Sequence, residues 1–295
     1  MAVLKTEQLT YVYSQGTPFE KTAVDHVDLE IKEGEIVGVM GHTGSGKSTL
    51  IQHFNGLLKS TSGRVLLDGK DIWEDKSKIR DVRFRVGLVF QYPEHQIFEE
   101  TVFRDIAFGP KNMGLSENEI KKRVTETALD LGLSEELMNR SPFELSGGQK
   151  RRVAIAGVMA MKPEILILDE PTAGLDPLGR RQMLSYIQDY HRKTGATVLI
   201  VSHSMEDIAV FADKILVMNR SRLFCFDDTR KVFGKAEQLT EIGLDVPQIT
   251  RVFMKLKEKG YDFGTEIYTV ESAKKAVLDF LRKNGGNTIC SKILQ

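Results

Sequence analysis

The sequence predicts an α/β protein with a mainly parallel β-sheet, antiparallel strands at one edge, an inserted helical subdomain and a small C-terminal helical module. Short segments rich in β-branched residues alternate with longer segments of helical periodicity, which is typical of a parallel sheet flanked by helices. Strand signals are missing between Pro93 and Ala160, and the composition after Asp228 becomes rich in lysine, glutamate and glycine. We therefore expect one domain over residues 1–228, with its helical subdomain at about 93–160, and a second module over residues 229–295.

Five short apolar segments are expected to form the parallel strands. They are IVGVM (36–40), VGLVF (86–90), ILILD (165–169), TVLIV (197–201) and KILVM (214–218). Nearly continuous apolar strands suit a sheet that is covered on both faces. The first 35 residues differ, because LTYVY and VDHVDLEI alternate apolar with polar residues around the turn-like SQGTPFE. This alternation predicts antiparallel strands at one edge.

Helices are expected in the subdomain and in the C-terminal module. The segment SENEIKKRVTETALDLG is amphipathic, and Ser116 with Glu119 has the spacing of a capping box. In the module, VPQITRVFMKLKEKG and VESAKKAVLDFLRKNGG are also amphipathic, and no motif of nucleotide chemistry falls there. Such helices must bury their apolar faces on something, so we expect residues 229–295 to pair subunits.

The overall charge and the apolar runs limit the kinds of partner. Lys+Arg and Asp+Glu are both 41, so the net charge is zero and a nucleic-acid partner is disfavoured. The longest apolar runs are a few residues long, whereas a spanning helix needs roughly 20. The segment MAVLKTEQLTYVY lacks the features of a secretory signal, so we expect a cytosolic protein. Cys225 and Cys290 lack metal-ligand spacing and are interpreted as structural or incidental.

The segment GHTGSGKST follows a predicted strand and opens a helix that is expected to run to about Gly56. Its glycines let backbone N–H groups converge on phosphate oxygens, its lysine supplies a positive charge, and its serine hydroxyl can bind magnesium. A glycine-rich turn without a ligand is disfavoured by the combination of strand, loop, Lys-Ser and helix. The sequence therefore predicts a P-loop, made of Gly41, His42, Thr43, Gly44, Ser45, Gly46, Lys47, Ser48 and Thr49.

Two acids follow the four apolar residues of the predicted strand at 165–169. Asp169 and Glu170 emerge at the carboxyl end of a buried strand, where ligands collect in open α/β sheets. Asp169 is expected to hold Mg²⁺, directly or through water, and Glu170 to polarise the attacking water. Helix-capping acids before Pro171 are the alternative, which the neighbouring P-loop disfavours.

Polar residues also follow two other predicted strands, Gln91 after VGLVF and His203 after TVLIVS. If the strands are parallel, both side chains open into the same crevice as the P-loop. Gln91 is then a candidate near the metal and the water, and His203 near the γ-phosphate. Either residue alone is equally consistent with an ordinary polar group of a loop.

A second glycine-rich helix start, LSGGQ, precedes KRRVAIAGVMAM. Its free N–H groups could bind an additional phosphate, but the residue pattern by itself favours an ordinary N-cap. The residues concerned are Ser146, Gly147, Gly148 and Gln149.

Taken together, the order and spacing of the P-loop, the glutamine, LSGGQ, ILILDE, AGLDP (173–177) and the histidine resemble those of ABC transporter ATPases up to about Asp228. The resemblance implies ATP and Mg²⁺ as ligands and a head-to-tail pair of ATPase domains. The LSGGQ residues would close over the γ-phosphate on the partner's P-loop, and Asp176 would connect the two sites. Tyr13 resembles the residue that stacks on adenine. Tyr11 lies on the same strand face, so this choice rests on family spacing alone.

Longer segments are similar to the energy-coupling-factor (ECF) importers of bacteria, which take up vitamins and transition-metal ions. These segments are GHTGSGKST, FQYPEHQIFEETVFRDIAFGPKN (90–112) and SPFELSGGQKRRVAIAGVMAM. The histidine-threonine pair and SPFE resemble the second of the two A-type ATPases. The resemblance implies a second ABC ATPase subunit, with a heterodimer favoured over a homodimer. It also implies a transmembrane coupling subunit, a substrate-binding membrane subunit and a peripheral position on the cytoplasmic face of the membrane.

Apolar QIF and TVF between Gln91 and Phe108 suggest a groove for helices of a transmembrane partner, although core packing is an alternative. A soluble ABC ATPase acting on chromosomes, repair or ribosomes is the competing function. The stretch from Lys47 to Ser146 is too short for a long coiled coil, and one cassette is present. A degenerate ATP-binding module with a regulatory role would have lost the catalytic base or the switch histidine. Glu170 and His203 are both in place.

Overall fold

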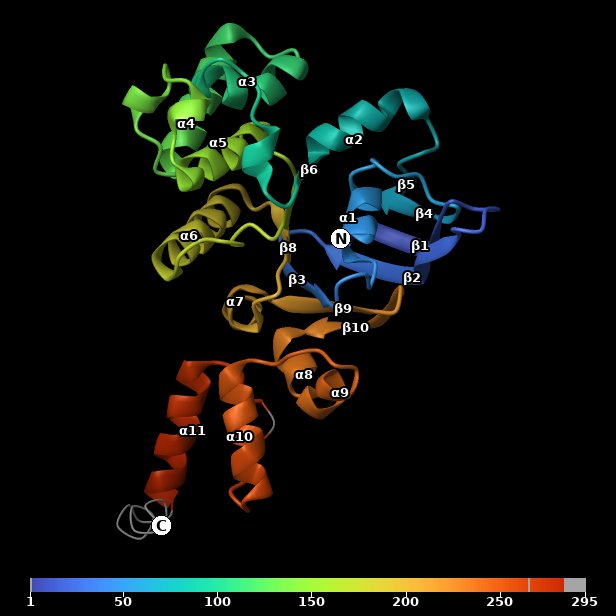
Figure 1. The fold of residues 1–295 in the computed structure, drawn as a ribbon, viewed down its shortest axis with the longest axis vertical. Coiled ribbons are helices and arrows are strands. Elements are labelled where there is room, and N and C mark those ends of the chain that lie inside the picture. Colours follow the sequence, from blue (N-terminus) through green and yellow to red (C-terminus); the bar gives the residue numbers. More distant parts are fainter. Residues whose placement is uncertain (1, 265, 284–295) are drawn as a thin grey trace.

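The computed structural model of the chain describes residues 2–264 and 266–283, and its centre is a six-stranded sheet (Figure 1). The strand order is β10-β9-β3-β8-β7-β6, and the five strands from β9 to β6 are parallel. The bounds are β3 (Ile36–Gly41), β6 (Val86–Val89), β7 (Ile165–Asp169), β8 (Thr197–Val201), β9 (Lys214–Asn219) and β10 (Arg222–Asp228). The prediction of a mainly parallel sheet is confirmed. The antiparallel edge strand β10 was not predicted, because its side chains are mostly exposed or half-buried and lack an apolar run.

The N-terminal strands form a second, antiparallel sheet with the order β2-β1-β4-β5. The bounds are β1 (Ala2–Tyr13), β2 (Lys21–Lys32), β4 (Ser62–Leu67) and β5 (Lys70–Asp71). The expected antiparallel strands are therefore present as β1 and β2, in a sheet of their own that two further strands from beyond the P-loop helix extend on the β1 side. The two sheets touch where the backbone N–H of Asp25 in β2 donates to the carbonyl of Ser221, at 2.8 Å.

The helical subdomain lies at one end of the molecule, at the top of Figure 1. Its helices are α3 (Val102–Asn112), α4 (Glu117–Asp130) and α5 (Gly147–Met159), with one-turn 3-10 helices at Pro93–Gln96, Glu135–Leu137 and Pro142–Glu144. The Ser116 hydroxyl accepts from the backbone N–H of Glu119 at 3.4 Å, so the Ser116 half of the predicted capping box of α4 is present. The other helices of the first 228 residues are α1 (Lys47–Phe54), a 3-10 turn (Lys76–Lys78), α2 (Ile79–Arg85), α6 (Pro177–Thr194) and α7 (Met205–Phe211).

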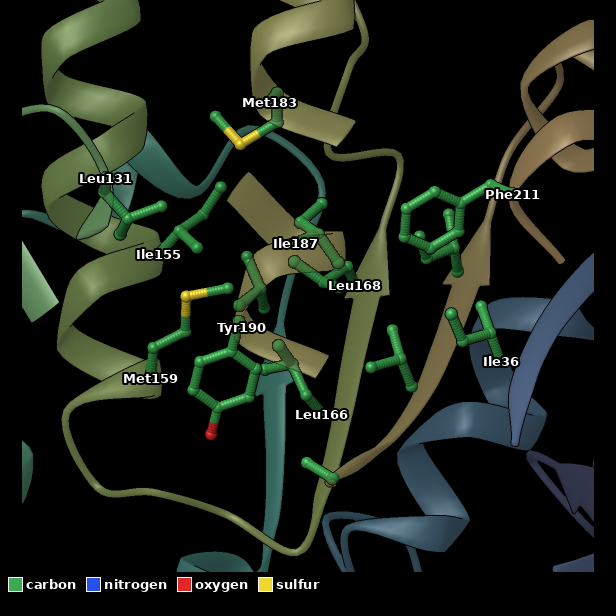
Figure 2. Close-up of a cluster of buried hydrophobic side chains, with 14 of the residues drawn as sticks. Ile36, Leu131, Ile155, Met159, Leu166, Leu168, Met183, Ile187, Tyr190 and Phe211 are labelled. Carbon is green, nitrogen blue, oxygen red and sulfur yellow. The ribbon is translucent and has the colours of Figure 1, made fainter. Parts of the chain in front are cut away.

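The five parallel strands of this sheet are buried on both faces, because alternate residues of these strands enter two different hydrophobic clusters. Leu166 and Leu168 of β7 pack with Ile155 of α5 and Ile187 of α6 (Figure 2). The alternate residues Ile165 and Ile167 belong to the second cluster, which contains the apolar side of α1 and the antiparallel sheet. This burial explains why the strands could be recognised from short apolar runs.

The chain after β10 has two parts that pack differently. Helices α8 (Thr229–Phe233) and α9 (Ala236–Glu241) contribute Phe233 and Leu239 to the main hydrophobic cluster, and Leu244 and Val246 follow them. Helices α10 (Gln248–Glu258) and α11 (Val270–Lys283) have a small cluster of their own around Phe253. They extend away from the sheets at the lower end of Figure 1.

Among the described residues, no helix has the length and apolar character that crossing a bilayer requires. Cys225 is a free, half-buried thiol, and burial raises its pKa. Cys290 and the rest of the C-terminal segment after Lys283 lie outside the described residues.

Candidate functional site

A pocket opens at the carboxyl ends of β3, β6, β7 and β8, where polar ligands of α/β sheets usually bind. Eleven of the residues singled out in the sequence line this pocket. They are Tyr13, Thr43, Gly44, Gly46, Lys47, Ser48, Thr49, Gln91, Asp169, Glu170 and His203. The parallel register places Gln91, the acidic pair and His203 beside the P-loop although they are far apart in the sequence, and Tyr13 reaches the pocket from the antiparallel sheet.

Glycine is required at three positions of the P-loop for different structural reasons. Gly41 (φ 150°) and Gly46 (φ 101°) lie so close to the backbone of β9 and β2 that a Cβ would collide with the carbonyl oxygens of Met218 and Ala23. Gly44 has φ 79°, and a Cβ there would meet nothing within 4 Å. Gly41 and Gly46 therefore allow close packing, whereas Gly44 supplies a positive φ that glycine adopts without strain.

Lys47 is the buried positive charge of the loop. Its Nζ donates to the carbonyls of Gly41 at 2.7 Å and His42 at 2.9 Å. Burial lowers the pKa of its ammonium, and the nearby carboxylates of Glu170 and Asp169 oppose this shift. A buried ammonium beside free backbone N–H groups suits an anion with several oxygens.

The two acids after β7 are buried beside the loop. Burial raises the pKa of Asp169, while a hydrogen bond from Ser48 and the charge of Lys47 oppose the rise. Burial, and then the negative charge of Asp169, raise the pKa of Glu170 to about 7. The Glu170 backbone has φ 53°, a conformation that costs energy outside glycine, and its Oε1 has no hydrogen-bond partner within the described part of the chain. Nε2 of His203 lies 3.6 Å from this oxygen.

The oxygen atoms of this pocket fit a hard divalent cation. Ser48, Gln91 and Asp169 contribute a hydroxyl, an amide and a carboxylate from three different elements, and all three line the pocket. Magnesium prefers such oxygen ligands and usually takes only one or two carboxylates, with substrate phosphates completing its coordination.

Tyr13 and Tyr11 have different environments. Tyr13 lines the pocket, is 38% exposed, and its hydroxyl lies 3.2 Å from Oγ1 of Thr49. Tyr11 packs against the second hydrophobic cluster, with its ring 4.8 Å from that of His53. The geometry therefore favours Tyr13 as the residue available for a base. Lys21 and Ala23 of β2 also line the pocket, and sequence motifs gave no sign of them. Only the strand register, which pairs Lys21 with Tyr13, brings them there.

Eight of the singled-out residues do not line the pocket. Ser146 and Gln149 form the capping box of α5, with the Ser146 hydroxyl accepting from the Gln149 N–H at 3.3 Å. Asp176 caps α6 by accepting from the Gly179 N–H at 2.6 Å. A Cβ on Gly147 or Gly148 would meet nothing within 4 Å. Within one chain the LSGGQ motif is thus an ordinary helix start, as the residue pattern by itself favoured. The eight residues are Gly41, His42, Ser45, Ser146, Gly147, Gly148, Gln149 and Asp176.

A buried arginine that was not predicted connects three of the motifs. Arg151 of α5 forms a bidentate ion pair with Glu94, which lies in the turn that follows Gln91. Its Nε and Nη2 donate to the two carboxylate oxygens at 3.0 and 2.7 Å. Its Nη1 also donates to the carbonyl of Ala173, in the loop between Glu170 and Asp176. The guanidinium therefore joins the helix of LSGGQ to the two loops that border the pocket.

The fold and the pocket define a P-loop nucleoside triphosphatase. The loop supplies N–H groups and a buried lysine for phosphates, the acidic pair lies opposite, and an exposed helix start carries LSGGQ on an inserted subdomain.

Comparison with known proteins identifies the class more closely. The ABC transporter family matches residues 24–173. The energy-coupling factor transporter ATP-binding protein EcfA2 of Clostridium tetani is 54% identical over 285 residues, covering 96% of this chain and 99% of that protein. The EcfA2 protein of Caldanaerobacter subterraneus is 53% identical over 279 residues, covering 95% and 98%.

Solved structures agree with these relatives. CbiO1 from Clostridium perfringens, described as part of the ABC transporter complex cbiONQ, superposes with a TM-score of 0.73 at 39% identity. The match covers 87% of this chain and 99% of that one. The ATP-binding cassette MJ0796, solved as a dimer bound to ADP and Pi, gives a TM-score of 0.70 at 30% identity, covering 77% and 99%.

The chain belongs to the ABC transporter family and, within it, to the energy-coupling factor transporter ATP-binding proteins. It is an ATP-binding and ATP-hydrolysing subunit. The alternative of a soluble ABC ATPase with a role outside transport is not favoured by these relatives.

Proposed function

We propose that this chain binds and hydrolyses MgATP to energise an ECF-type importer of vitamins or transition-metal ions. The observation that carries the proposal is the single pocket that gathers the P-loop lysine, the acidic pair, a glutamine, a histidine and an exposed tyrosine. The names of the relatives, and the cbiONQ complex that contains CbiO1, support transport as the process that uses the ATP.

The chain's own residues would bind both the adenine and the phosphates of ATP. The ring of Tyr13 would stack on adenine, since it is half-exposed and held by Thr49 at the pocket wall. The N–H groups of the P-loop would surround the phosphates, and Lys47 would exchange its contacts with loop carbonyls for phosphate oxygens. Ser48, Asp169 and Gln91 would hold Mg²⁺, which when bound neutralises phosphate charge.

Glu170 would act as the general base. Its carboxylate is buried, its Oε1 lacks a hydrogen-bond partner inside the described ranges, and its pKa is raised to about 7 by burial and by Asp169. A base with a pKa near the working pH transfers protons efficiently. His203, 3.6 Å from the same oxygen, would orient the γ-phosphate and the water.

A complete site would need a second ATPase subunit. The LSGGQ residues of this chain lie outside its own pocket, at a helix start with open space around Gly147 and Gly148. We expect them to close over the γ-phosphate bound to the P-loop of a partner ABC ATPase, in a heterodimer rather than a homodimer, with Asp176 connecting the two sites. The dimeric form described for MJ0796 supports such a pairing.

The remaining expected partners are a transmembrane coupling subunit and a substrate-binding membrane subunit, with this chain peripheral on the cytoplasmic face. An exposed aromatic pair supports a contact with helices of the coupling subunit. Phe98 and Phe108 are 59% and 45% exposed, and their rings meet edge to face at 4.9 Å. Exposed aromatic residues in such a cluster are typical of protein interfaces.

The proposal is tested by separating ATP binding from hydrolysis. Glu170→Gln keeps the shape of the side chain but removes the base, so the steady-state ATPase rate should fall by about 10²–10⁴-fold while ATP still binds. The variant should then accumulate as an ATP-bound closed dimer. Lys47→Ala should instead lose nucleotide affinity before any dimer forms.

Both variants are measured in complex with the physiological partner ATPase, by ATPase rate and by ATP-dependent dimerisation. If Glu170→Gln hydrolyses ATP at its own site within a few-fold of the wild-type rate, Glu170 is not the base, and His203 becomes the next candidate.

A further inference from the structure

The side chain of His42 lies outside the nucleotide pocket although its backbone is part of the P-loop. Its ring Nε2 is 2.9 Å from the carbonyl oxygen of Ile242, 200 positions later in the chain. A carbonyl oxygen can only accept, so Nε2 carries the hydrogen and donates it. This contact joins the P-loop directly to the turn that ends α9.

The geometry of that turn leaves the Ile242 carbonyl available. Helix α9 ends with the N–H of Leu244 donating to the carbonyl of Leu239, and the N–H of Gly243 donating to that of Thr240, both at 2.9 Å. These two bonds are those of a Schellman motif, which satisfies the carbonyls one turn earlier. The carbonyl of Ile242, the last residue before the left-handed glycine, points instead to His42.

Gly243 fits this contact for two independent reasons. Its φ is 79°, which glycine adopts without strain, and a Cβ there would lie 3.2 Å from Nε2 of His42. Another residue would therefore strain the turn and crowd the imidazole. The glycine thus lets the turn approach the His42 ring closely enough for the hydrogen bond.

The contact joins the P-loop backbone to a turn that is anchored in the main hydrophobic cluster. The carbonyl of His42 accepts from the N–H of Ser45 at 3.1 Å, so residue 42 helps to set the backbone of the loop. At the other end, Leu239 and Leu244 are buried in the main hydrophobic cluster and fix the turn. The imidazole thus ties the phosphate-binding backbone to a rigid anchor that continues directly into α10.

We propose that His42 is a positioning residue that couples nucleotide binding at the P-loop to the C-terminal module through the α9 turn. The proposal rests on the ATP site described above but assigns the His42 side chain a role away from the nucleotide. The contact holds the loop in its binding shape, and nucleotide binding in turn stabilises the α9 turn. Such coupling is reciprocal, because each event must favour the other by the same factor.

The test uses three variants of the full-length chain. His42→Ala removes the donor, and His42→Gln replaces it by an amide N–H₂ of similar reach. Glu241→Ala is the control, since it removes an exposed side chain from the same turn without touching the contact. The probe is a Mg²⁺ complex of an ATP analogue with a non-hydrolysable β–γ bond. Its Kd is measured, together with amide hydrogen exchange over residues 239–246 with and without the analogue.

We expect His42→Ala to raise the Kd by about 3- to 10-fold, the range that one hydrogen bond supplies. His42→Gln should recover most of this loss, and the Glu241→Ala control should bind like the wild type. In the wild type the analogue should slow exchange across the α9 turn, and in His42→Ala this protection should be lost. In the assembled ATPase the His42→Ala defect should appear as a raised KM.

Two results would overturn the proposal. One is an unchanged Kd with full protection of the α9 turn in His42→Ala. The other is an equal loss of affinity in Glu241→Ala, which would show that any disturbance of the turn has the same effect. Failure of the wild type to bind the analogue would instead contradict the proposed function, so the two failures can be told apart.

Discussion

Arg151 illustrates how one buried residue can organise several motifs. It is 4% exposed, pairs with Glu94 and donates to the carbonyl of Ala173. Burial raises the pKa of Glu94, but the hydrogen bond and charge of Arg151 outweigh this, so the pKa is lowered overall. The carboxylate is therefore ionised and depends on its partner, and the same guanidinium fixes the loop that leads from Glu170 to Asp176.

The dependence of Glu94 on Arg151 can be measured by a double-mutant cycle. Arg151→Met leaves a half-buried carboxylate unpaired, so we expect the free energy of unfolding to fall by about 3 kcal/mol. Glu94→Gln by itself should cost less, because its amide can still accept from Arg151. The double variant should be more stable than the sum of the two single losses predicts. Urea unfolding of all four proteins supplies the free energies, and strictly additive losses would show that the two side chains are not coupled.

At the scale of elements, the structure divides the aromatic residues around α3 between core and surface. Phe103 packs against the main cluster, which supports core packing for this residue. Phe98 and Phe108 remain exposed and contact each other. Asp105 of α3 holds the segment before the helix by accepting from the N–H groups of Phe98 and Glu99, both at 3.2 Å. The exposed pair is thus presented on a fixed surface.

The prediction at this scale concerns membrane association. Phe98→Ser combined with Phe108→Ser should abolish binding to membranes that contain the coupling subunit, because the apolar contact is lost while the fold is kept. Phe103→Ser serves as the control and should lower the unfolding temperature instead, since it affects the core. Co-sedimentation with membranes and thermal unfolding give the two readouts. Undiminished membrane binding by a folded Phe98/Phe108 double variant would place the contact elsewhere.

At the scale of the whole molecule, the C-terminal module consists of two layers, of which the first attaches it to the main core. The first layer runs from α8 to Val246 and shares the main core. Helices α10 and α11 surround mainly the small cluster near Phe253, although Met254 of α10 also packs against the main core. The N–H of Gln248 at the start of α10 donates to Glu206 of α7 at 3.1 Å, so the junction has a polar contact as well. This division suggests that only the second layer is free to pair subunits.

Two truncations test that division. A chain ending at residue 247 keeps Phe233, Leu239 and the His42 contact, so it should fold and bind ATP but dimerise poorly. A chain ending at residue 228 loses several fully buried side chains, each worth about 1.5–3 kcal/mol, and should be unstable. Thermal unfolding and analytical ultracentrifugation with the partner ATPase check both outcomes. Equal dimer affinity of the full chain and the 247-residue chain would remove subunit pairing from the module.

Much of the fold and the pocket could be predicted from the sequence, for local reasons. Short β-branched runs are recognisable because both faces of a parallel strand are buried, and the P-loop is recognisable because phosphate binding needs glycine, lysine and serine at fixed spacing. The positions of Gln91, Asp169 and His203 in one pocket followed from a single rule, that parallel strands end at the same edge of the sheet.

Other features depend on contacts between distant segments, which local patterns do not encode. Lys21 reaches the pocket only through its register with Tyr13. Arg151 meets Glu94 only after the subdomain folds. β10 forms a strand because it pairs with the free edge of β9. The bond from His42 to Ile242 joins residues 200 positions apart. The sequence determined the strand–loop–helix unit and its phosphate chemistry. Tertiary packing decided which side chains of that unit face the nucleotide and which, like His42, face the rest of the protein.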